Sequence, residues 1–295
     1  MANQMSRLSF YDEIRKNKVY SVLLIMIVAV VLVLLVYSIG MAFSQIDAFA
    51  LLIMGIIISL VYVLIGYYSS SGMALLSVNA KPADRRLHKQ YYDSVEGLSL
   101  ASGLPMPKLY IMQNPQINAF ASGRNPQNSV VCVTTGALEK LNKQELEGVL
   151  AHEMSHIANY DIRFMTLTAA LVGMIAIISE IFLRSLWLRS SSDDSKGNAI
   201  FLIIGIVLAI LAPIIVLLVQ LAISRRREYG ADSSAVKFMR TPTGLIGALT
   251  KIKGNSEMKV SGAVAPLFIA KPNRAAELFS THPDINMRIE KLRRM

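Results

Sequence analysis

Four long apolar stretches set the strongest limit on how this 295-residue chain can fold. Each is near or above the roughly 20 residues that a helix needs to cross a bilayer. The third carries Glu180 and the fourth carries Pro213 and Gln220, and polar side chains inside a span more often face other helices or a cavity than lipid. With 53% hydrophobic residues and a mean hydropathy of +0.46, the chain is predicted to be a membrane protein. The four expected spans are residues 19–40, 49–68, 164–183 and 199–223.

The basic residues predict which side of the membrane each segment faces. The net charge is +10, and Lys and Arg gather before the first span, after the second and after the fourth. The positive-inside rule places these segments and both termini in the cytoplasm of a multi-pass protein of the cell (plasma or inner) membrane. Because topology accounts for the charge, we expect no nucleic-acid partner. The lone Cys132 rules out an intrachain disulfide, and Ala42-Phe43-Ser44 is interpreted as the end of an uncleaved anchor rather than a signal-peptide cleavage site.

A His-Glu-x-x-His motif begins at His152 and predicts a metal site. His152 and His156 are one helical turn apart, so both rings lie on one helix face and can bind one ion. Neutral imidazole suits Zn²⁺, the ion lowers the pKa of water to about 7, and Glu153 lies beside it as a proton acceptor. Asn142 and Glu145 predict a capping box for a helix over residues 143–160. The alternative, a helix that binds no metal, would leave inward-facing polar groups without partners.

The third ligand of a catalytic zinc must come from elsewhere in the chain. Besides the motif, only His88 and His282 are histidines, and Glu228 is the better candidate. Glu228 and Asp232 are four residues apart on a predicted helix, where Asp232 would accept the second ring N–H of a ligating histidine. The alternative is a solvated, charged helix end beside residues 225–227. Two expected spans, an even number, separate the motif from Glu228, so both segments lie on the same side of the membrane.

The expected spans divide the chain into five parts. These are a cytoplasmic N-terminal tail (1–18), a first transmembrane hairpin (19–68), the first half of a cytoplasmic domain (69–160), a second hairpin (161–223) and the second half of that domain (224–295). Within the first half, the sequence predicts a helix over residues 84–102 and strands over residues 108–112 and 129–134.

The chain resembles the HtpX family of membrane zinc metalloproteases, relatives of the CAAX prenyl proteases, over essentially its whole length. The match rests on residues 118–121, on the zinc helix with Asn159 and Asp161 beyond it, on residues 228–232, and on residues 280–283 followed by Arg288. Together with the four transmembrane helices, it implies a mainly α membrane protein with an α+β, zincin-like cytoplasmic metalloprotease domain that carries a small sheet. It also implies one zinc per chain with Glu228 as third ligand. Asp161 either orients a ligating histidine or terminates a helix.

The resemblance also suggests side chains near the substrate: Asn118, Ala119, Phe120, His282 and Arg288. The first three would lie on an edge strand that pairs with an extended peptide by main-chain hydrogen bonds. For Asn118, an Asx turn in a loop is an equal alternative. His282 and Arg288 would be donors to the developing oxyanion, and an ordinary histidine at a helix start is the alternative for His282.

These observations predict a zinc endopeptidase in which Glu153 takes a proton from the attacking water and passes it to the leaving amine. The resemblance implies a quality-control role, the cleavage of misfolded or damaged membrane proteins on the cytoplasmic side. Expected partners are membrane-protein or unfolded polypeptide substrates and the bilayer; oligomeric state, cleavage preference and regulation stay open. Three alternatives remain: a prenyl-protein (CAAX-type) protease, a non-enzymatic zinc-stabilised membrane scaffold, and a small transporter suggested by Glu180 and Gln220.

Overall fold

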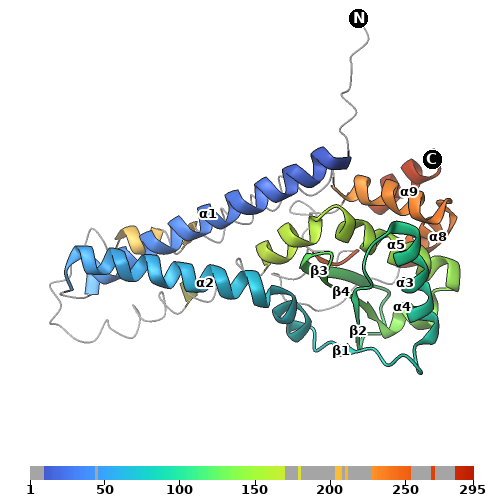
Figure 1. The fold of residues 1–295 in the computed structure, drawn as a ribbon, viewed down its shortest axis with the longest axis horizontal. Coiled ribbons are helices and arrows are strands. Elements are labelled where there is room, and N and C mark those ends of the chain that lie inside the picture. Colours follow the sequence, from blue (N-terminus) through green and yellow to red (C-terminus); the bar gives the residue numbers. More distant parts are fainter. Residues whose placement is uncertain are drawn as a thin grey trace, which may run out of the picture.

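The computed structural model describes residues 10–43, 46–169, 179–180, 203–207, 210–211, 227–253, 267–269 and 283–295. Two long helices, α1 (Phe10–Phe43) and α2 (Ala48–Ser77), extend away from a domain of shorter helices and strands (Figure 1). That domain contains the zinc motif. The expected spans 164–183 and 199–223 fall largely outside the described residues, so four transmembrane helices stay a prediction.

Helices α1 and α2 form an antiparallel pair with the composition of a membrane hairpin. Within the described residues, Asn17–Met41 and Ala48–Ser77 are the helices long and apolar enough to cross a bilayer. Asp47 caps α2 by accepting hydrogen bonds from the first backbone N–H groups of that helix. Large apolar side chains such as Ile57, 56% exposed, cover the outer surfaces of the pair. Helices that are apolar on every face need an apolar solvent, which supports two of the four expected spans.

Helix α2 extends nine residues beyond the expected end of its span at residue 68. Its last turns are less apolar, but Ser70, Ala74 and Leu75 are buried. Ala74 and Leu75 pack with Phe120 and Cys132 of the sheet in one apolar cluster. The membrane hairpin therefore joins the domain through packed side chains rather than through a loop.

A small mixed sheet forms the base of the domain. Its strands are β1 (Lys81–Pro82), β2 (Lys108–Met112), β3 (Ala119–Asn125) and β4 (Asn128–Thr134), in the order β1-β2-β4-β3. β2 and β4 are parallel, whereas β3 and β4 form an antiparallel hairpin that leaves β3 at the edge. The strands expected at residues 108–112 and 129–134 correspond to β2 and β4. β2 has the expected bounds, and β4 begins one residue earlier than expected.

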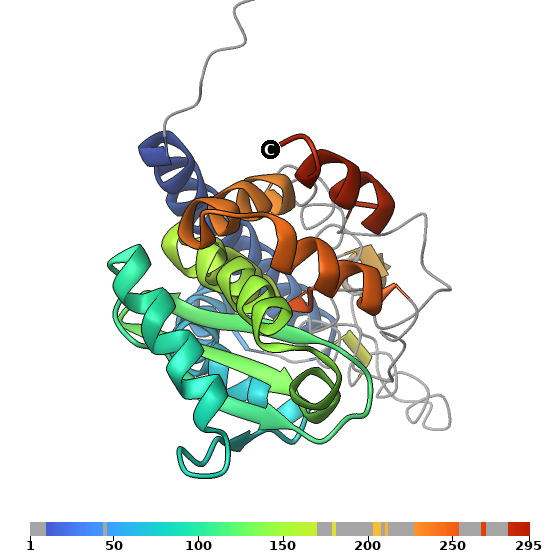
Figure 2. The ribbon, with the colours of Figure 1, turned by 90° about the vertical axis from the view of Figure 1, so that its right-hand side faces the viewer.

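Helix α5 (Lys143–Ala158), which carries the zinc motif, lies between the sheet and the helical residues 227–252 (Figure 2). Asn142 and Glu145 form the expected capping box, and the helix ends two residues before the predicted residue 160. Helix α3 (Lys89–Ser102) packs beside α5; it begins five residues later than expected, because Asp84 caps a turn by accepting from Arg86 and Leu87. The remaining helices with defined bounds are α4 (Thr135–Lys140), α8 (Thr243–Ile252) and α9 (Ile285–Leu292).

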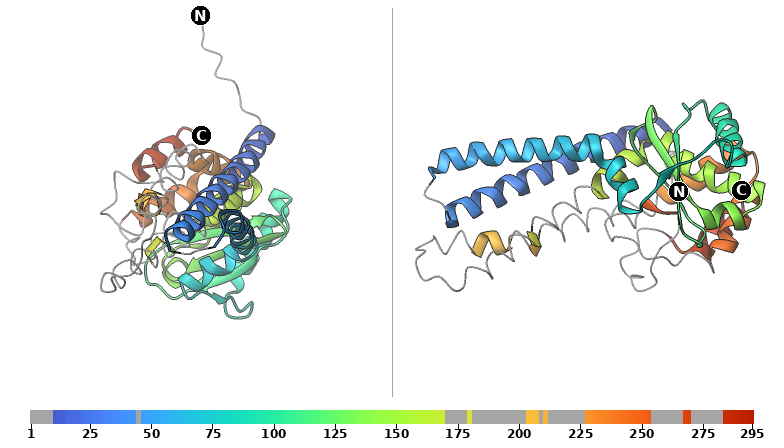
Figure 3. Two further views of the ribbon diagram at one scale, coloured as in Figure 1. Left: turned by 90° about the vertical axis from the view of Figure 1, so that its left-hand side faces the viewer. Right: turned by 90° about the horizontal axis from the view of Figure 1, so that it is seen from below.

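One apolar core contains side chains from residues 83–162 and from the later residues 227–253 and 283–295. That core joins Val131 and Val133 of the sheet, Leu150 and Met154 of α5, and Leu249 of α8. In the views of Figure 3, the hairpin of α1 and α2 projects from one end of this domain. This packing agrees with two sequence-distant halves of one domain, while the exact division at residues 68, 160 and 223 stays a prediction.

Gly148 allows α5 and α8 to approach closely. A Cβ added at this position would lie 2.6 Å from the carbonyl carbon of Gly244 and closer still to the amide nitrogen of Leu245. Backbone atoms cannot move aside as a flexible side chain can. The contact places α5 against α8, which follows the helical residues 227–239 that include Glu228.

We expect Gly148→Ala to lower the free energy of unfolding by about 1–3 kcal/mol, because it forces α5 and α8 apart. Gly97→Ala is the matched control: an added Cβ there would meet no atom within 4 Å, and alanine should stabilise the middle of α3 by roughly 0.5–1 kcal/mol. Denaturant unfolding of the purified proteins measures both. Equal stability of the two variants would contradict the close helix contact.

Candidate metal centre

Helix α5 brings the two motif histidines together inside the domain. His152 is fully buried and His156 is 4% exposed. Their Nε2 atoms lie 3.2 Å apart, while their Nδ1 atoms bond to separate carboxylates. Both Nε2 atoms could therefore bind the same metal ion.

Glu228 brings its carboxylate to that same point from the helical residues 227–239. Its Oε2 lies 3.5 Å from His152 Nε2, and its Oε1 lies 3.5 Å from His156 Nε2. Two donors that each bind a tetrahedral zinc ion at about 2.05 Å lie about 3.3 Å apart. The two 3.5 Å distances involve different oxygens of Glu228, and one donor atom from each of the three residues lies within 4.8 Å of the others, a group that could hold one metal ion after a small adjustment of the side chains.

Each histidine has a carboxylate partner on its other ring nitrogen. Asp161 Oδ2 lies 3.0 Å from His156 Nδ1, and Asp232 Oδ1 lies 3.0 Å from His152 Nδ1. Such partners hold Nδ1 protonated and leave Nε2 as the donor to a metal. Asp232 thus lies where the sequence analysis expected it, and of the two alternatives for Asp161 its position favours the one in which it orients a histidine.

Arg288 lies near the site, as the resemblance suggested, but its guanidinium is committed to the histidine partner. It donates from Nε and Nη2 to both oxygens of Asp232, at 3.0 and 2.7 Å, and from Nη1 to the carbonyl of Ile269 at 3.1 Å. Burial alone would raise the pKa of Asp232, but Arg288 and His152 outweigh it and lower that pKa to about 2. Arg288 itself is fully buried, so its donors are directed to these groups rather than to a substrate oxyanion.

Glu153 is buried beside the histidines, and neither of its carboxylate oxygens has a close hydrogen bond within the described part of the chain. Burial raises its pKa, although the charged forms of His152 and His156 and the backbone N–H of Ala121 act in the opposite direction. A buried carboxyl group with an elevated pKa is suited to accepting and returning a proton.

The formal charges around the site fit a divalent cation. Four carboxylates, those of Glu153, Asp161, Glu228 and Asp232, are almost fully buried. The guanidinium of Arg288 is paired with Asp232, and that of Arg227 feels the charges of Asp161 and Glu228. With all four carboxylates ionised and both imidazoles neutral, two negative charges would remain, which one divalent ion would balance. Without the ion, burial raises the pKa of Glu153, and the hydrogen bonds of His152 to Asp232 and Glu228 outweigh its burial and raise its pKa to about 9.

The residues expected on a substrate strand lie at the edge of the sheet. Ala119 and Phe120 begin β3, and Asn118 comes just before it, fully buried, with its carbonyl accepting from Thr134 N. The carbonyl of Ala119 faces the other way and accepts from Ile269 N at 2.9 Å. Alternation along a strand directs the backbone of Ala121 to the same outer side, consistent with its effect on Glu153. Asn118 therefore continues the sheet, whereas His282 lies outside the described residues.

Two residues at the site were not predicted from the sequence, Asn17 and Arg227. Asn17 belongs to α1 and donates to Asp161, and Arg227 stacks over Phe164 with 4.4 Å to the ring centroid. Arg227 carried a weak signal as the neighbour of Glu228. Asn17 carried none, because a single polar residue before an apolar stretch is the ordinary start of a span.

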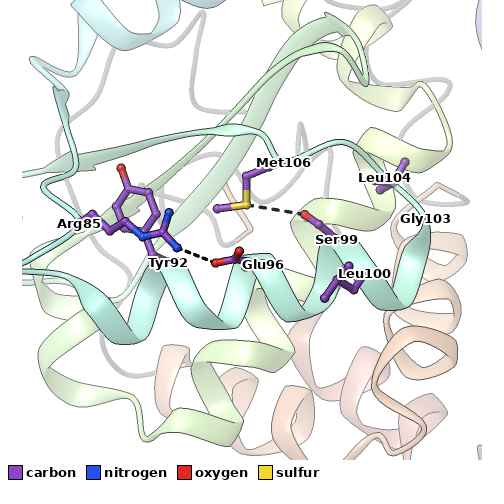
Figure 4. Close-up of a pocket in the computed structure, with 8 residues that line it drawn as sticks. All are labelled: Arg85, Tyr92, Glu96, Ser99, Leu100, Gly103, Leu104 and Met106. Atoms are coloured by element: carbon purple, nitrogen blue, oxygen red, sulfur yellow. Dashed lines mark hydrogen bonds and ion pairs between the residues drawn. The ribbon is translucent and has the colours of Figure 1, made fainter.

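A separate cavity on the outer side of α3 is not connected to this chemistry. Figure 4 shows it, with Arg85 paired to Glu96 at one end and Ser99 directed at the sulfur of Met106. Its volume is about 620 Å³, and none of the metal-centre residues lines it.

A family model described as Peptidase family M48 matches residues 84–295. The chain belongs to this peptidase family. Relatives named "Protease HtpX homolog" match over most of its length. One from Caldanaerobacter subterraneus is 46% identical over 78% of this chain and 79% of its own length. Relatives from Dictyoglomus turgidum and Streptococcus pyogenes are 41% and 38% identical and cover 99% and 97% of this chain, and 96% and 99% of their own lengths.

Membership of the M48 family makes this chain a metal-dependent protease, and its apolar helices make it a membrane protein. The fold is also similar to the crystal structure of S. mikatae Ste24p, with a TM-score of 0.52 at 20% identity. That likeness covers 94% of this chain but 65% of the other, so this chain spans less than two thirds of that protein.

The buried pair of Arg288 and Asp232 gives a stability prediction for this M48 centre. Arg288→Met leaves a buried carboxylate without its counter-charge, and we expect metal-free protein to lose about 3–5 kcal/mol of its free energy of unfolding. The double variant Arg288→Met, Asp232→Asn removes that charge and should recover part of the loss. Arg294→Met, at an exposed pair with Glu290, is the control that should change nothing measurable. Equal free energies of unfolding for the Arg288 and Arg294 variants would contradict a stabilising role for the buried pair of Arg288 and Asp232.

Proposed function

We propose that this chain is a membrane-embedded zinc endopeptidase that cleaves misfolded or damaged membrane proteins on the cytoplasmic side. One observation carries the proposal. Nε2 of His152, Nε2 of His156 and the carboxylate of Glu228 are grouped so that they could hold one ion, and the buried carboxylate of Glu153 lies beside them. Three protein donors and a free position are the mark of a catalytic rather than a structural zinc site.

The donor set favours zinc among the common divalent ions. Two imidazoles and one carboxylate make a mixed nitrogen and oxygen site, whereas Mg²⁺ and Ca²⁺ prefer oxygen donors alone. A zinc ion held here supplies Lewis-acid polarisation of the scissile carbonyl and lowers the pKa of water to about 7.

The side chains of this chain then carry the proton transfers. Glu153 accepts a proton from the water whose oxygen bonds to the carbonyl carbon of the substrate. It returns that proton to the amide nitrogen as the C–N bond breaks, so the amine leaves neutral and Glu153 regains its charge. Asp161 and Asp232 keep the histidine rings oriented throughout, because each holds one ring N–H.

The edge of β3 is the proposed binding strand for an extended substrate. The outward backbone of Ala121 lies next to Glu153, and Ile269 occupies the preceding outward position by bonding to Ala119. A peptide added beside Ala121 would be held by main-chain hydrogen bonds, which read extended backbone rather than side-chain identity. Unfolded segments of many proteins satisfy this requirement, and the adjoining membrane hairpin favours substrates that lie in or at the bilayer.

Two other functions share parts of this site. A prenyl-protein protease would use the same metal chemistry, but relatives that match over the whole length are named as HtpX homologues. A zinc-stabilised membrane scaffold would bind the metal but would not need Glu153 as a proton acceptor. The next experiment separates the scaffold from the protease.

Glu153→Gln should retain about one zinc per chain and lose casein digestion by 100-fold or more, because the amide cannot accept a proton while the ligands stay in place. His156→Ala should lose both zinc and activity. Glu147→Gln, a partly buried glutamate on the same helix that bonds to Ser94, is the control that should keep both. Metal analysis and casein digestion of purified protein measure these outcomes, and proteolysis retained by Glu153→Gln would refute the mechanism.

The cytoplasmic placement can be tested with a single thiol. Gln127 is exposed in the turn between β3 and β4, whereas the natural Cys132 is buried, and burial raises the pKa of its thiol well above the usual value. In a Cys132→Ala background, Gln127→Cys should react with a membrane-impermeant maleimide in inside-out vesicles and not in intact cells. Labelling of intact cells would place the protease domain outside the cytoplasm.

A further inference from the structure

We infer that Asn17 of α1 is a positioning residue of the metal centre, so that the first membrane helix is part of the site that binds zinc. This inference rests on the proposed metal-dependent function and names a residue outside the family model match, which begins at residue 84.

Asn17 lies on the inner face of α1 at the start of the candidate span Asn17–Met41. It is 5% exposed, whereas its neighbours Lys18 and Val19 are exposed. Ser21, Leu24 and Val28 continue the same buried stripe along the helix, and the last two pack with Phe164 and Leu167. A polar amide in such a stripe is costly unless its hydrogen bonds are satisfied.

The Asn17 amide satisfies that requirement at the end of the zinc helix. Its Nδ2 donates to Asp161 Oδ1 at 2.6 Å and to the carbonyl of Asn159 at 3.0 Å. Asn159 is the C-cap of α5, and Asp161 is the residue whose other oxygen holds His156 Nδ1. One side chain thus fixes both the end of the zinc helix and the carboxylate that orients a zinc ligand.

A second contact from α1 supports the same turn. Tyr160, between Asn159 and Asp161, has a left-handed backbone with φ of 59°, which is strained for a residue with a side chain. The Lys18 ammonium lies 4.4 Å from the centroid of its ring. Two successive residues of α1 therefore hold the turn that sets the position of Asp161.

The two zinc histidines consequently depend on different parts of the fold. The carboxylate partner of His152 is fixed within the protease domain, by Arg288. The carboxylate partner of His156, which also interacts with the charge of Arg227, accepts a hydrogen bond from Asn17 of the membrane helix. Displacement of α1 would release Asp161 and loosen one ligand, so tight zinc binding requires α1 in its packed position.

Zinc retention of the full-length protein in detergent measures this dependence directly. Asn17→Leu, which removes both N–H donors at similar size, should raise the rate of zinc loss to a chelator by about tenfold, within the range found when partners of ligating side chains are removed. Ser21→Ala is the matched control, one turn along the same buried face, where the hydroxyl donates to the carbonyl of Asn17 in its own helix. That variant should stay within about twofold of wild type.

A double-mutant cycle distinguishes positioning from a general loss of packing. If Asn17 acts through Asp161, then Asn17→Leu added to Asp161→Asn should cause no further acceleration of zinc loss. The inference would be overturned if the double variant lost zinc at a rate that is the product of the two single effects, or if Asn17→Leu lost zinc as slowly as wild type. Absence of bound zinc in the wild type would instead defeat the proposed function, so the two failures are distinguishable.

Discussion

Compensation of buried charge at the metal centre governs this structure. Four carboxylates and two imidazoles lie almost wholly out of water around one point, and the two nearby guanidinium groups cannot neutralise them. A divalent ion bound at this point would compensate the carboxylates that carry charge. The fold brings the proposed ligands together: α5 supplies two of them and residues 227–239 supply the third. Each histidine ring also has a carboxylate partner on its Nδ1 atom.

This arrangement also connects the catalytic domain with the membrane helices. The end of α2 packs on one face of the sheet, and α1 contacts the turn that follows the zinc helix. The edge strand β3, the proposed metal ligands and the hairpin of α1 and α2 therefore belong to one continuous set of contacts. Under the proposed role of Asn17, retention of zinc would depend on the position of α1.

Local patterns in the sequence predicted much of this architecture. The capping box at Asn142, the i and i+4 spacing of the histidines and the strand at 108–112 are short-range signals, and the structure has each of them. The even number of expected spans and helical spacing allowed Glu228 and Asp232 to converge on the histidines, and the family resemblance decided in favour of Glu228 as the third ligand. The pairing of the two histidines needed only the periodicity of a helix and the bonding rules of zinc.

The features that were not predicted are contacts between distant residues with no local pattern. Arg288 was expected to face the substrate, but it lies 56 positions from Asp232 in sequence and bonds to it through a fully buried guanidinium. Asn17 is 144 positions from Asp161, and the last turns of α2, which continue to Ser77, pack on the sheet through Ala74 and Leu75. Such outcomes are decided by tertiary packing, which single-sequence patterns do not record.

X-ray absorption spectroscopy at the zinc edge of the purified protein tests the central claim most directly. The account predicts one zinc with two imidazole nitrogens and carboxylate and solvent oxygens at about 2.0–2.2 Å, in four- or five-fold coordination. A shell made of oxygen atoms alone, a sulfur ligand from Cys132, or protein that retains no zinc would contradict it.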